Sequence, residues 1–534
     1  MIAQSAPSTK RSLVVSAAFI MLGNLASSIM GLVRQGVVAA LGPGIAAPFV
    51  AALTPLQTFL DLLANGTVSG ALIPTFADFS DDAKRQELGR IVSSIVNLLI
   101  LVALTVAIIY SFVAPWVATH LLAVGFTADQ QVLTSQLSQI VMFALVIMGP
   151  FAVFQAALYA CHKFGRAAFA AGFLHVGVII GAIATSMWGT TRLGRVGLAF
   201  GVILGACVQL ALLIPVLKRH RLPYMLVLNV GHPAIRRTLR LYAPLAPSYL
   251  VSMCVVFVDL SLASRTPGNP AANVAALKLA TTVIQFPAGL VAAALSFAIL
   301  PLLSRYATDG DEARFKETLT LGLRLGLLLM IPATVGLIAL RDPITSLLFE
   351  HRHYTAQNAA LTAVMLRNYA YQLPFIVVDQ LVMFAFYARK NTMVPVVVGF
   401  VCYGFYALVA FPFYRTIGAP ALAFANTAQN SMHGLILIAL FYRYFGSIGL
   451  RASLPGILKM VVAAAVMAIV VWRLQALMTG YPLFSLHTLR GQILTILITG
   501  IAGIAVYVSS ISLLRVEETS LLKQIVLARM AKRV

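Results

Sequence analysis

Residues 68–82 have the sequence VSGALIPTFADFSDD, and residues 295–310 have the sequence LSFAILPLLSRYATDG. Both stretches contain the pattern S-x-A-x-x-P, and in both an aspartate lies eight residues after the proline. One identical offset in residue number relates three pairs: Ser69 and Ser296, Pro74 and Pro301, Asp82 and Asp309. Self-similarity at one fixed offset indicates an internal repeat of the fold.

A second pair of stretches has nearly the same offset. ALYACHKFGRAAFAAGF (157–173) resembles AFYARKNTMVPVVVGF (385–400). Gly172 matches Gly399 at the offset of the first pair, and Tyr159 matches Tyr387 within a single position of it. Two pairs at one offset are hard to explain by chance, so the sequence predicts two copies of one structural unit.

The composition is that of a membrane protein. The chain has 534 residues, of which 60% are hydrophobic and 10% are charged, whereas soluble domains carry about 25% charged residues. The net charge of +22 does not predict a nucleic-acid partner, because Lys and Arg collect in the cytoplasmic loops of membrane proteins. The length rule gives about fourteen spans across the lipid bilayer, at 12–34, 46–76, 91–121, 133–161, 167–188, 197–217, 237–263, 272–303, 319–340, 359–387, 393–414, 419–445, 454–477 and 489–513.

The repeat offset covers six of these spans, an even number, so both copies face the same way. We therefore predict an all-α polytopic membrane protein of two parallel six-helix halves plus a C-terminal helix pair. Such halves form transporters whose substrate site lies between them. The predicted parts are an N-terminal lobe (1–222), a C-terminal lobe (223–447), and helices 13 and 14 with a cytoplasmic tail (448–534).

Loop charge predicts the orientation. With Lys10 and Arg11 in the cytoplasm, the even-numbered connections are cytoplasmic, among them KRHRLPYM (218–225) and RRTLR (236–240). Most Lys and Arg residues outside the spans then lie inside, as the positive-inside rule requires. We expect a multi-pass protein with both termini in the cytoplasm.

Charged side chains within spans are costly and usually face a cavity or a partner. The strongest candidates are Arg34 (in GLVRQ, 31–35), Asp61, Asp259 and Lys278. Each has a plainer interpretation. Arg34 would then reach the outer interface, Asp61 would pair with a neighbour, and Asp259 and Lys278 would neutralise each other.

Three further candidates are charged residues in predicted spans. Arg324 and Arg367 lie near the starts of their helices, where we expect them to extend to the membrane surface. Asp379 is expected to pair with a neighbour.

The sequence gives no support for an enzyme. His175 and His433 are the mid-span histidines, and neither has an acidic residue nearby in sequence. No phosphate-binding glycine loop and no metal-ligand cluster is present in the sequence. We predict a transporter without a catalytic residue, a cofactor or a metal site.

Several stretches resemble one family. KRSLVVSAAFIMLGNLASSIMGLVRQGVVAALGPG (10–44), LLANGTVSGALIPTFADF (62–79) and VIQFPAGLVAAALSFAILPLLSR (283–305) resemble the first, second and eighth helices of the MurJ (MviN) lipid II flippases. FYARKNTMVPV (386–396) is similar to a segment typical of that family, a branch of the multidrug/oligosaccharidyl-lipid/polysaccharide exporter superfamily. The order and spacing of these stretches carry the resemblance.

The resemblance implies a flippase that moves lipid-linked peptidoglycan precursor (lipid II) from the inner to the outer leaflet of a bacterial inner membrane by alternating access. The substrate would be an undecaprenyl-pyrophosphate-linked glycan, and cell-wall synthesis proteins are candidate partners. Arginine suits a pyrophosphate because its planar fork donates several hydrogen bonds and stays charged. Arg34 is then expected to contact the pyrophosphate, Lys278 to be a second cation, and Asp61 and Asp259 to be cavity charges.

The sequence departs from the family at charged positions. An Arg-Asp pair of the first helix is Arg34-Gln35 here, and an Asp-Arg pair of the eighth helix is Thr281-Thr282. Asp259 matches an aspartate of a sodium site in some members. The partner positions near Tyr406, Ala410 and Phe424 are apolar or aromatic, so we expect no sodium site.

Two alternatives follow from these departures. The chain could export another polyprenyl-linked oligosaccharide as a member of the same superfamily. It could also be a non-transporting MurJ-like membrane partner protein.

Overall fold

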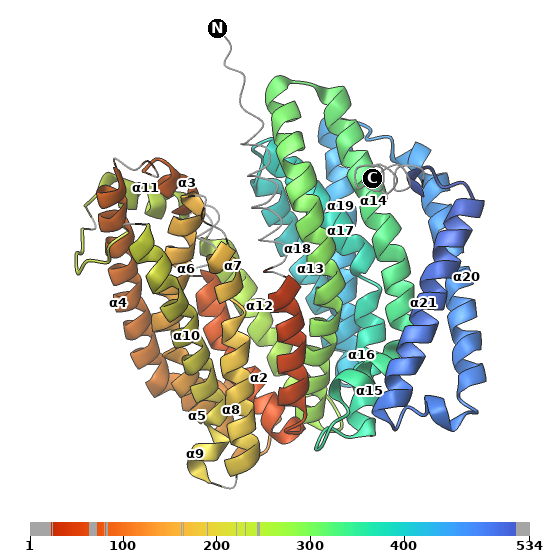
Figure 1. The fold of residues 1–534 in the computed structure, drawn as a ribbon, viewed down its shortest axis with the longest axis horizontal. Coiled ribbons are helices and arrows are strands. Elements are labelled where there is room, and N and C mark those ends of the chain that lie inside the picture. The colour runs from red at the N-terminus through yellow and green to blue at the C-terminus, as the bar shows by residue number, and fades with distance from the viewer. Residues whose placement is uncertain are drawn as a thin grey trace. The chain divides into compact units, whose positions relative to one another are not determined.

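The computed structural model describes residues 23, 25–62, 72–79, 81, 84–161, 163, 165–189, 191–220, 222–229, 231–242 and 246–519. The part of the chain so described is built from helices and contains no strand (Figure 1). The predicted all-α fold class is therefore confirmed. Ser69 and Asp82 of the first repeat copy, and Lys10 and Arg11, lie outside the described residues.

The chain divides into two compact units, Met1–Ala275 with His351–Tyr354, and Ala276–Glu350 with Thr355–Val534. The first unit holds the helix Leu25–Ala39, followed by α2 (Pro43–Leu60), α3 (Ile73–Ala77), α4 (Arg85–Val117), the π-helical turn η4 (Ala118–Leu122), α5 (Ala128–Met142), α6 (Leu145–Ala160), α7 (Gly165–Ala170), α8 (Phe173–Trp188), α9 (Arg192–Arg195), α10 (Gly197–Arg219), α11 (Pro233–Tyr242) and α12 (Ala246–Ser264).

Helix α13 (Pro270–Asp309) begins in the first unit and continues in the second. The second unit then holds α14 (Glu312–Ala339), α15 (Arg341–Phe349), α16 (Ala356–Ala370), α17 (Leu373–Ala388), α18 (Met393–Phe413), α19 (Ala419–Phe445), α20 (Leu450–Met478), the 3-10 turn η5 (Pro482–Phe484) and α21 (Leu489–Leu513).

By length and composition, eight helices of the described residues could cross a membrane, or up to ten if each of two bent pairs is one span. Shorter apolar helices cover Leu25–Ala39, Phe173–Trp188 and Met253–Ser264. Each of the predicted spans overlaps a helix or a helix pair of the described residues. The chain is polytopic, as the length rule predicted.

The two bent pairs support the internal repeat. Helices α5 and α6 meet at an angle of 42°, and α16 and α17 also meet at 42°. The first residues of α5 and α16, Ala128 and Ala356, are related by the same offset as the first residues of α6 and α17, Leu145 and Leu373. This offset lies within a single position of the one that relates Pro74 to Pro301 in the sequence repeat. Both halves therefore break the same helix at the same place.

Glycines bring α8 and α10 into unusually close contact. A Cβ atom on Gly181 would lie 2.6 Å from the carbonyl oxygen of Gly197 and 2.8 Å from Cα of Gly201. One on Gly177 would lie 2.3 Å from the backbone nitrogen of Gly205. Small residues spaced by four allow helix backbones in membranes to approach this closely.

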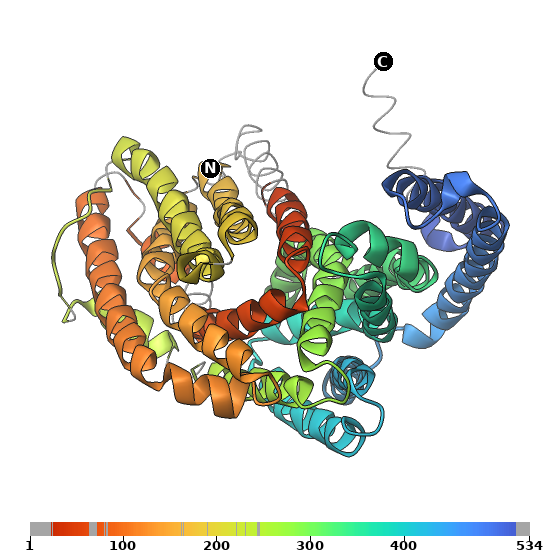
Figure 2. The same cartoon turned by 90° about the horizontal axis from the view of Figure 1, so that it is seen from below.

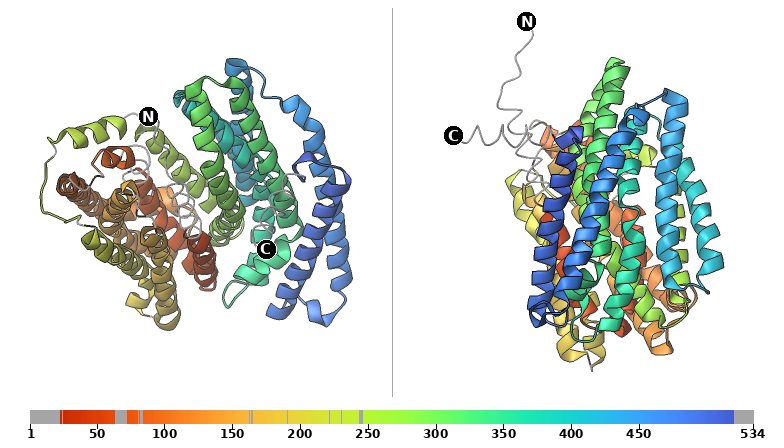
Figure 3. Two further views of the ribbon diagram at one scale, coloured as in Figure 1. Left: turned by 45° about the horizontal axis from the view of Figure 1, so that its top comes forward. Right: turned by 90° about the vertical axis from the view of Figure 1, so that its right-hand side faces the viewer.

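The C-terminal helix pair is part of the second unit. Helices α20 and α21 run side by side at its edge (Figures 2 and 3) and contact α14. Met460 and Met467 of α20 and Tyr507 of α21 share an apolar cluster with Leu328 of α14. The Tyr507 hydroxyl donates a hydrogen bond to the Leu328 carbonyl over 3.0 Å, which satisfies its polar end in an apolar setting.

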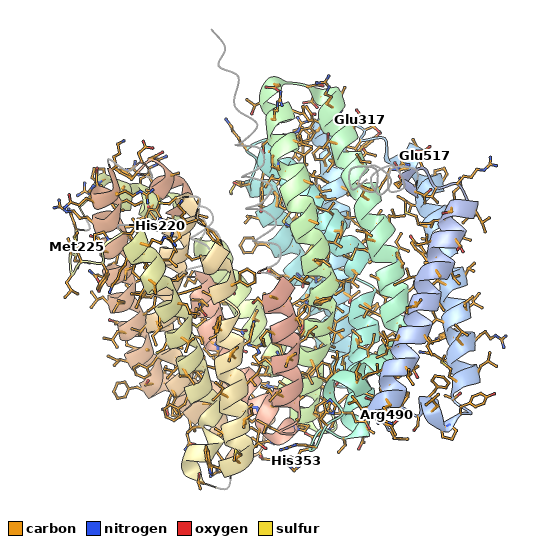
Figure 4. All side chains as sticks on the ribbon, viewed as in Figure 1. His220, Met225, Glu317, His353, Arg490 and Glu517 are labelled. Atoms are coloured by element: carbon orange, nitrogen blue, oxygen red, sulfur yellow. The ribbon has the colours of Figure 1, made fainter. Side chains whose placement is uncertain are left out.

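Loop positions within each unit follow the predicted alternation. In the first unit, His220 and Met225 lie at one end and His353 lies at the other (Figure 4). In the second unit, Glu317 and Glu517 share one end and Arg490 lies at the opposite end. Within each unit, the connections that the sequence analysis placed on opposite sides of the membrane lie at opposite ends.

Candidate functional site

The helix Leu25–Ala39 carries Arg34 on a face of small residues. Ser27, Gly31 and Arg34 are spaced by four and three residues, so they lie on one side of the helix. Arg34 is partly buried. It forms no ion pair with any described carboxylate, and its Nε atom is buried without a hydrogen-bond partner among the described residues.

His175, near the start of α8, packs against this face. Its Nε2 atom lies 3.4 Å from the Ser27 hydroxyl oxygen. A Cβ atom on Gly31 would lie 3.6 Å from the same nitrogen, so a glycine leaves room for the ring. The Arg34 charge acts on this imidazole, and the His175 Nδ1 atom is buried with no described hydrogen-bond partner.

This arrangement suits the binding of an anion better than acid–base catalysis. Arg34 offers N–H donors in a fixed fork, and His175 offers a ring nitrogen beside them. Among the described residues, no cluster of three or more His, Cys, Asp or Glu side chains has the geometry of a metal site.

The other predicted site residues come from other helices. Asp61 directly follows α2 and is exposed, and Asp259 lies partly buried in α12. Lys278 lies partly buried in α13. Arg34, Asp61 and Asp259 belong to the first unit, whereas Lys278 belongs to the second.

Thr281 and Thr282 lie where the resemblance described above leads us to expect an Asp-Arg pair. The hydroxyls of Thr281 and Thr282 both donate to the Lys278 carbonyl, over 2.8 and 2.9 Å. These hydroxyls are used within their own helix, and they carry no charge. Lys278 is therefore the cation of this helical turn.

The three further candidate charges have partners among the described residues. Arg324 contacts Glu517 and Glu518, two partners that the sequence analysis did not name. Arg367 is exposed and donates to the Asn368 side chain over 3.4 Å. Asp379 contacts His433, a partner far away in sequence that the sequence analysis missed.

Comparison with known proteins identifies the family. The family model described as "Lipid II flippase MurJ" matches residues 37–490. The chain belongs to the MurJ family. A probable lipid II flippase MurJ of Bdellovibrio bacteriovorus is 26% identical over 520 residues, which cover 96% of this chain and 97% of that protein. The lipid II flippase MurJ of Burkholderia cenocepacia is 26% identical over 380 residues, covering 70% and 72%.

Solved structures agree with the MurJ fold. A lipid II flippase MurJ in an inward closed conformation superposes with a TM-score of 0.74 at 21% identity, covering 92% of this chain and 98% of that one. An inward-facing multidrug transporter of the MATE family matches with a TM-score of 0.67 at 15% identity, covering 79% and 95%. This member of the MurJ family thus shares its fold with both of these proteins.

Proposed function

We propose that this chain is a lipid II flippase. It moves an undecaprenyl-pyrophosphate-linked peptidoglycan precursor from the inner to the outer leaflet of a bacterial inner membrane by alternating access. Membership of the MurJ family supports the substrate class. The support from this chain's own residues comes from Arg34. Its guanidinium is partly buried, and no described carboxylate neutralises it.

An uncompensated buried cation is expensive, because taking a charge out of water costs several kcal/mol. A bound pyrophosphate would lower that cost by accepting charge-assisted hydrogen bonds from the guanidinium. We therefore assign Arg34 to the pyrophosphate, Lys278 to a second cationic contact, and Asp61 and Asp259 to cavity charges. His175 and Ser27 hold the Arg34 face against α8.

The proposed transport lobes are residues 1–222 and 223–447, with residues 448–534 as an appended part. Alternating access requires two lobes that rearrange around one site. The equal bends of α5–α6 and α16–α17 support the assignment of one repeat copy to each lobe. In the proposed orientation, both termini lie in the cytoplasm, and cell-wall synthesis proteins are the candidate partners.

A second candidate is the export of another polyprenyl-linked oligosaccharide. Gln35 and the pair Thr281-Thr282 favour it, because they replace charged residues of the family with neutral ones. A different headgroup would require a different set of charges, while the pyrophosphate, and with it the role of Arg34, would be shared.

The test is the rescue of a bacterium depleted of its own MurJ, with lipid II accessibility measured at the outer leaflet. We expect the wild-type chain to restore both growth and accessibility. Arg34→Ala should restore neither, although the protein still inserts in the membrane. Normal rescue by Arg34→Ala would remove Arg34 from the mechanism, and growth of a glycan-export mutant instead would favour the second candidate.

A further inference from the structure

The second unit contains an acid–base pair that links three helices. Asp379 in α17 places Oδ1 at 2.5 Å from Nδ1 of His433 in α19. The other ring nitrogen, Nε2, lies 3.2 Å from the carbonyl oxygen of Pro395 in α18. The side chains of His433 and Asp379 are 13% and 22% exposed. One imidazole ring thus connects all three helices at a site that retains some access.

Glycines in α18 and α19 allow the helices to approach closely beside the pair. A Cβ atom on Gly399 of α18 would lie 3.7 Å from the His433 Nε2 atom. One on Gly434 of α19 would lie 3.4 Å from the Asp379 backbone nitrogen and 3.2 Å from the Phe375 carbonyl oxygen. The helices approach closely at the pair, so the ring has little freedom to turn away from either contact.

The two contacts together require one proton more than a carboxylate and a neutral imidazole possess. The Pro395 carbonyl can only accept, so Nε2 must carry a hydrogen. A carboxylate also only accepts, so the contact between Nδ1 and Oδ1 needs a second hydrogen, on the ring or on Asp379. A neutral imidazole has a single N–H. The observed geometry is therefore that of the proton-loaded pair.

No other charged side chain among the described residues contacts the ring of His433. Among the described residues, Asp379 is the charged group that acts on His433. The neighbouring polar contact, between Asn430 and Gln372, is neutral. On the helices packed against α19, the other titratable side chains include Cys402, whose thiol lies in the field of Asp379, Tyr403 and Tyr406 of α18, and Arg367 and Tyr369 of α16.

We infer that Asp379 and His433 form a proton-binding site, and that the bound proton holds α17, α18 and α19 together. When the proton leaves to water, Asp379 stays a carboxylate and His433 becomes a neutral ring with one N–H. The ring can then donate to Asp379 or to Pro395, but not to both, so one helix contact is lost. As part of the proposed flippase, on which this step rests, the site couples proton binding to rearrangement of its lobe.

The variant Asp379→Asn is expected to keep the helix contacts of the pair while removing the proton that titrates. An asparagine can donate from its amide to His433 Nδ1 while Nε2–H still donates to Pro395. Both contacts then persist with a neutral ring, and nothing at the pair titrates. His433→Gln serves to assign the histidine signal, since the chain has nine histidines.

Nitrogen-15 NMR of histidine-labelled protein in lipid tests proton binding without any transport. We expect wild-type His433 to carry hydrogens at both contacts in acid and to lose one as the pH is raised through about 5 to 8, the range in which histidines titrate. In Asp379→Asn, a single N–H at Nε2 should persist throughout. Ring nitrogen signals of wild-type His433 that stay unchanged across that whole range overturn the inference.

Proteoliposomes test the coupling. An imposed pH gradient, at zero membrane potential, should accelerate lipid II flipping by the wild type, and the ratio of rates with and without the gradient should fall to unity in Asp379→Asn. A gradient response that survives in this variant contradicts the coupling. A wild type that binds the proton but flips no lipid II counts against the proposed function and leaves the proton site supported.

Discussion

Arg389 donates a hydrogen bond from Nη2 to Oε2 of Glu312 over 2.6 Å, and this contact joins the end of α17 to the start of α14. The guanidinium carbon also lies 4.2 Å from the ring centroid of Phe445 and 4.4 Å from that of Phe315. The Arg389 side chain is 15% exposed, whereas that of Glu312 is 56% exposed. The aromatic contacts are thus better shielded from water than the ion pair.

From this difference we predict that Arg389→Ala destabilises the second unit by about 2 kcal/mol, through the loss of partly desolvated cation–π contacts. Glu312→Gln should cost less than about 1 kcal/mol, because exposed ion pairs contribute little. Arg389→Lys should lie between them, since an ammonium does not stack on a ring as a planar guanidinium does. Thermal unfolding in detergent measures the stability of the three variants. A larger loss of stability for Glu312→Gln than for Arg389→Ala would refute the predicted order.

The packing of α8 on α10 gives a second prediction. Gly181→Ala would place a methyl group 2.6 Å from the Gly197 carbonyl oxygen, so we expect a loss of about 1–3 kcal/mol from overpacking. Gly336 in α14 is the matched control, because a Cβ atom there meets nothing within 4 Å. Gly336→Ala should be neutral or stabilising by up to about 1 kcal/mol through helix propensity. Equal effects of the two substitutions on the unfolding temperature would contradict the close approach.

The segment after α21 is held on α14 by Arg324. Glu518 is 1% exposed and forms an ion pair with Arg324, and the Arg324 Nη2 atom donates to Glu517 over 2.6 Å. Removing one partner of a buried ion pair costs up to about 3–5 kcal/mol, and Glu517 would still compensate part of the Arg324 charge. We expect Glu518→Gln to expose residues 514–519 to hydrogen exchange far more than Glu517→Gln, and the reverse order would show that the buried partner is not the anchor.

The same contact predicts a dependence on pH. The hydrogen bond from Arg324 holds the pKa of the Glu517 carboxyl below its ordinary value. Because the folded pKa is depressed, the stabilisation is present above the unfolded pKa, about 4.3, and is lost as the pH falls through the folded pKa. Hydrogen exchange of residues 514–519 should therefore rise as the pH is lowered through this range. The rise should be smaller in Glu517→Gln, which has no carboxyl to protonate there.

Much of the fold follows from sequence, because the length of an apolar run dictates where a helix can cross a bilayer. The span predicted at 489–513 coincides with α21, and that at 197–217 lies within α10. The run 133–161, by contrast, is two helices meeting at 42°. A length rule cannot detect such a bend, because it counts the apolar residues of a run and carries no information on the direction of the backbone.

The site was less predictable, because side chains meet across helices. The sequence singled out Arg34 as a charge within an apolar run, and it named both Asp379 and His433. It did not pair these two, which are 54 positions apart. Nor did it pair Arg324 with Glu518, because the acidic partner follows the last helix. The signal available in each case was a lone in-span charge, which predicts a partner without identifying it.

The last prediction concerns the fork of Arg34. If this residue contacts a pyrophosphate, then geometry as well as charge should matter, because arginine donates two parallel hydrogen bonds where lysine acts as a point charge. In the rescue assay we expect Arg34→Lys to support partial lipid II exposure at the outer leaflet, Arg34→Ala none, and Lys278→Gln a reduced amount. Arg473→Gln removes an equal charge from an exposed position of α20 and should behave as the wild type. Full activity of Arg34→Lys would show that this position requires only a positive charge. Equal failure of Arg34→Lys and Arg473→Gln would show that the assay does not report on the site.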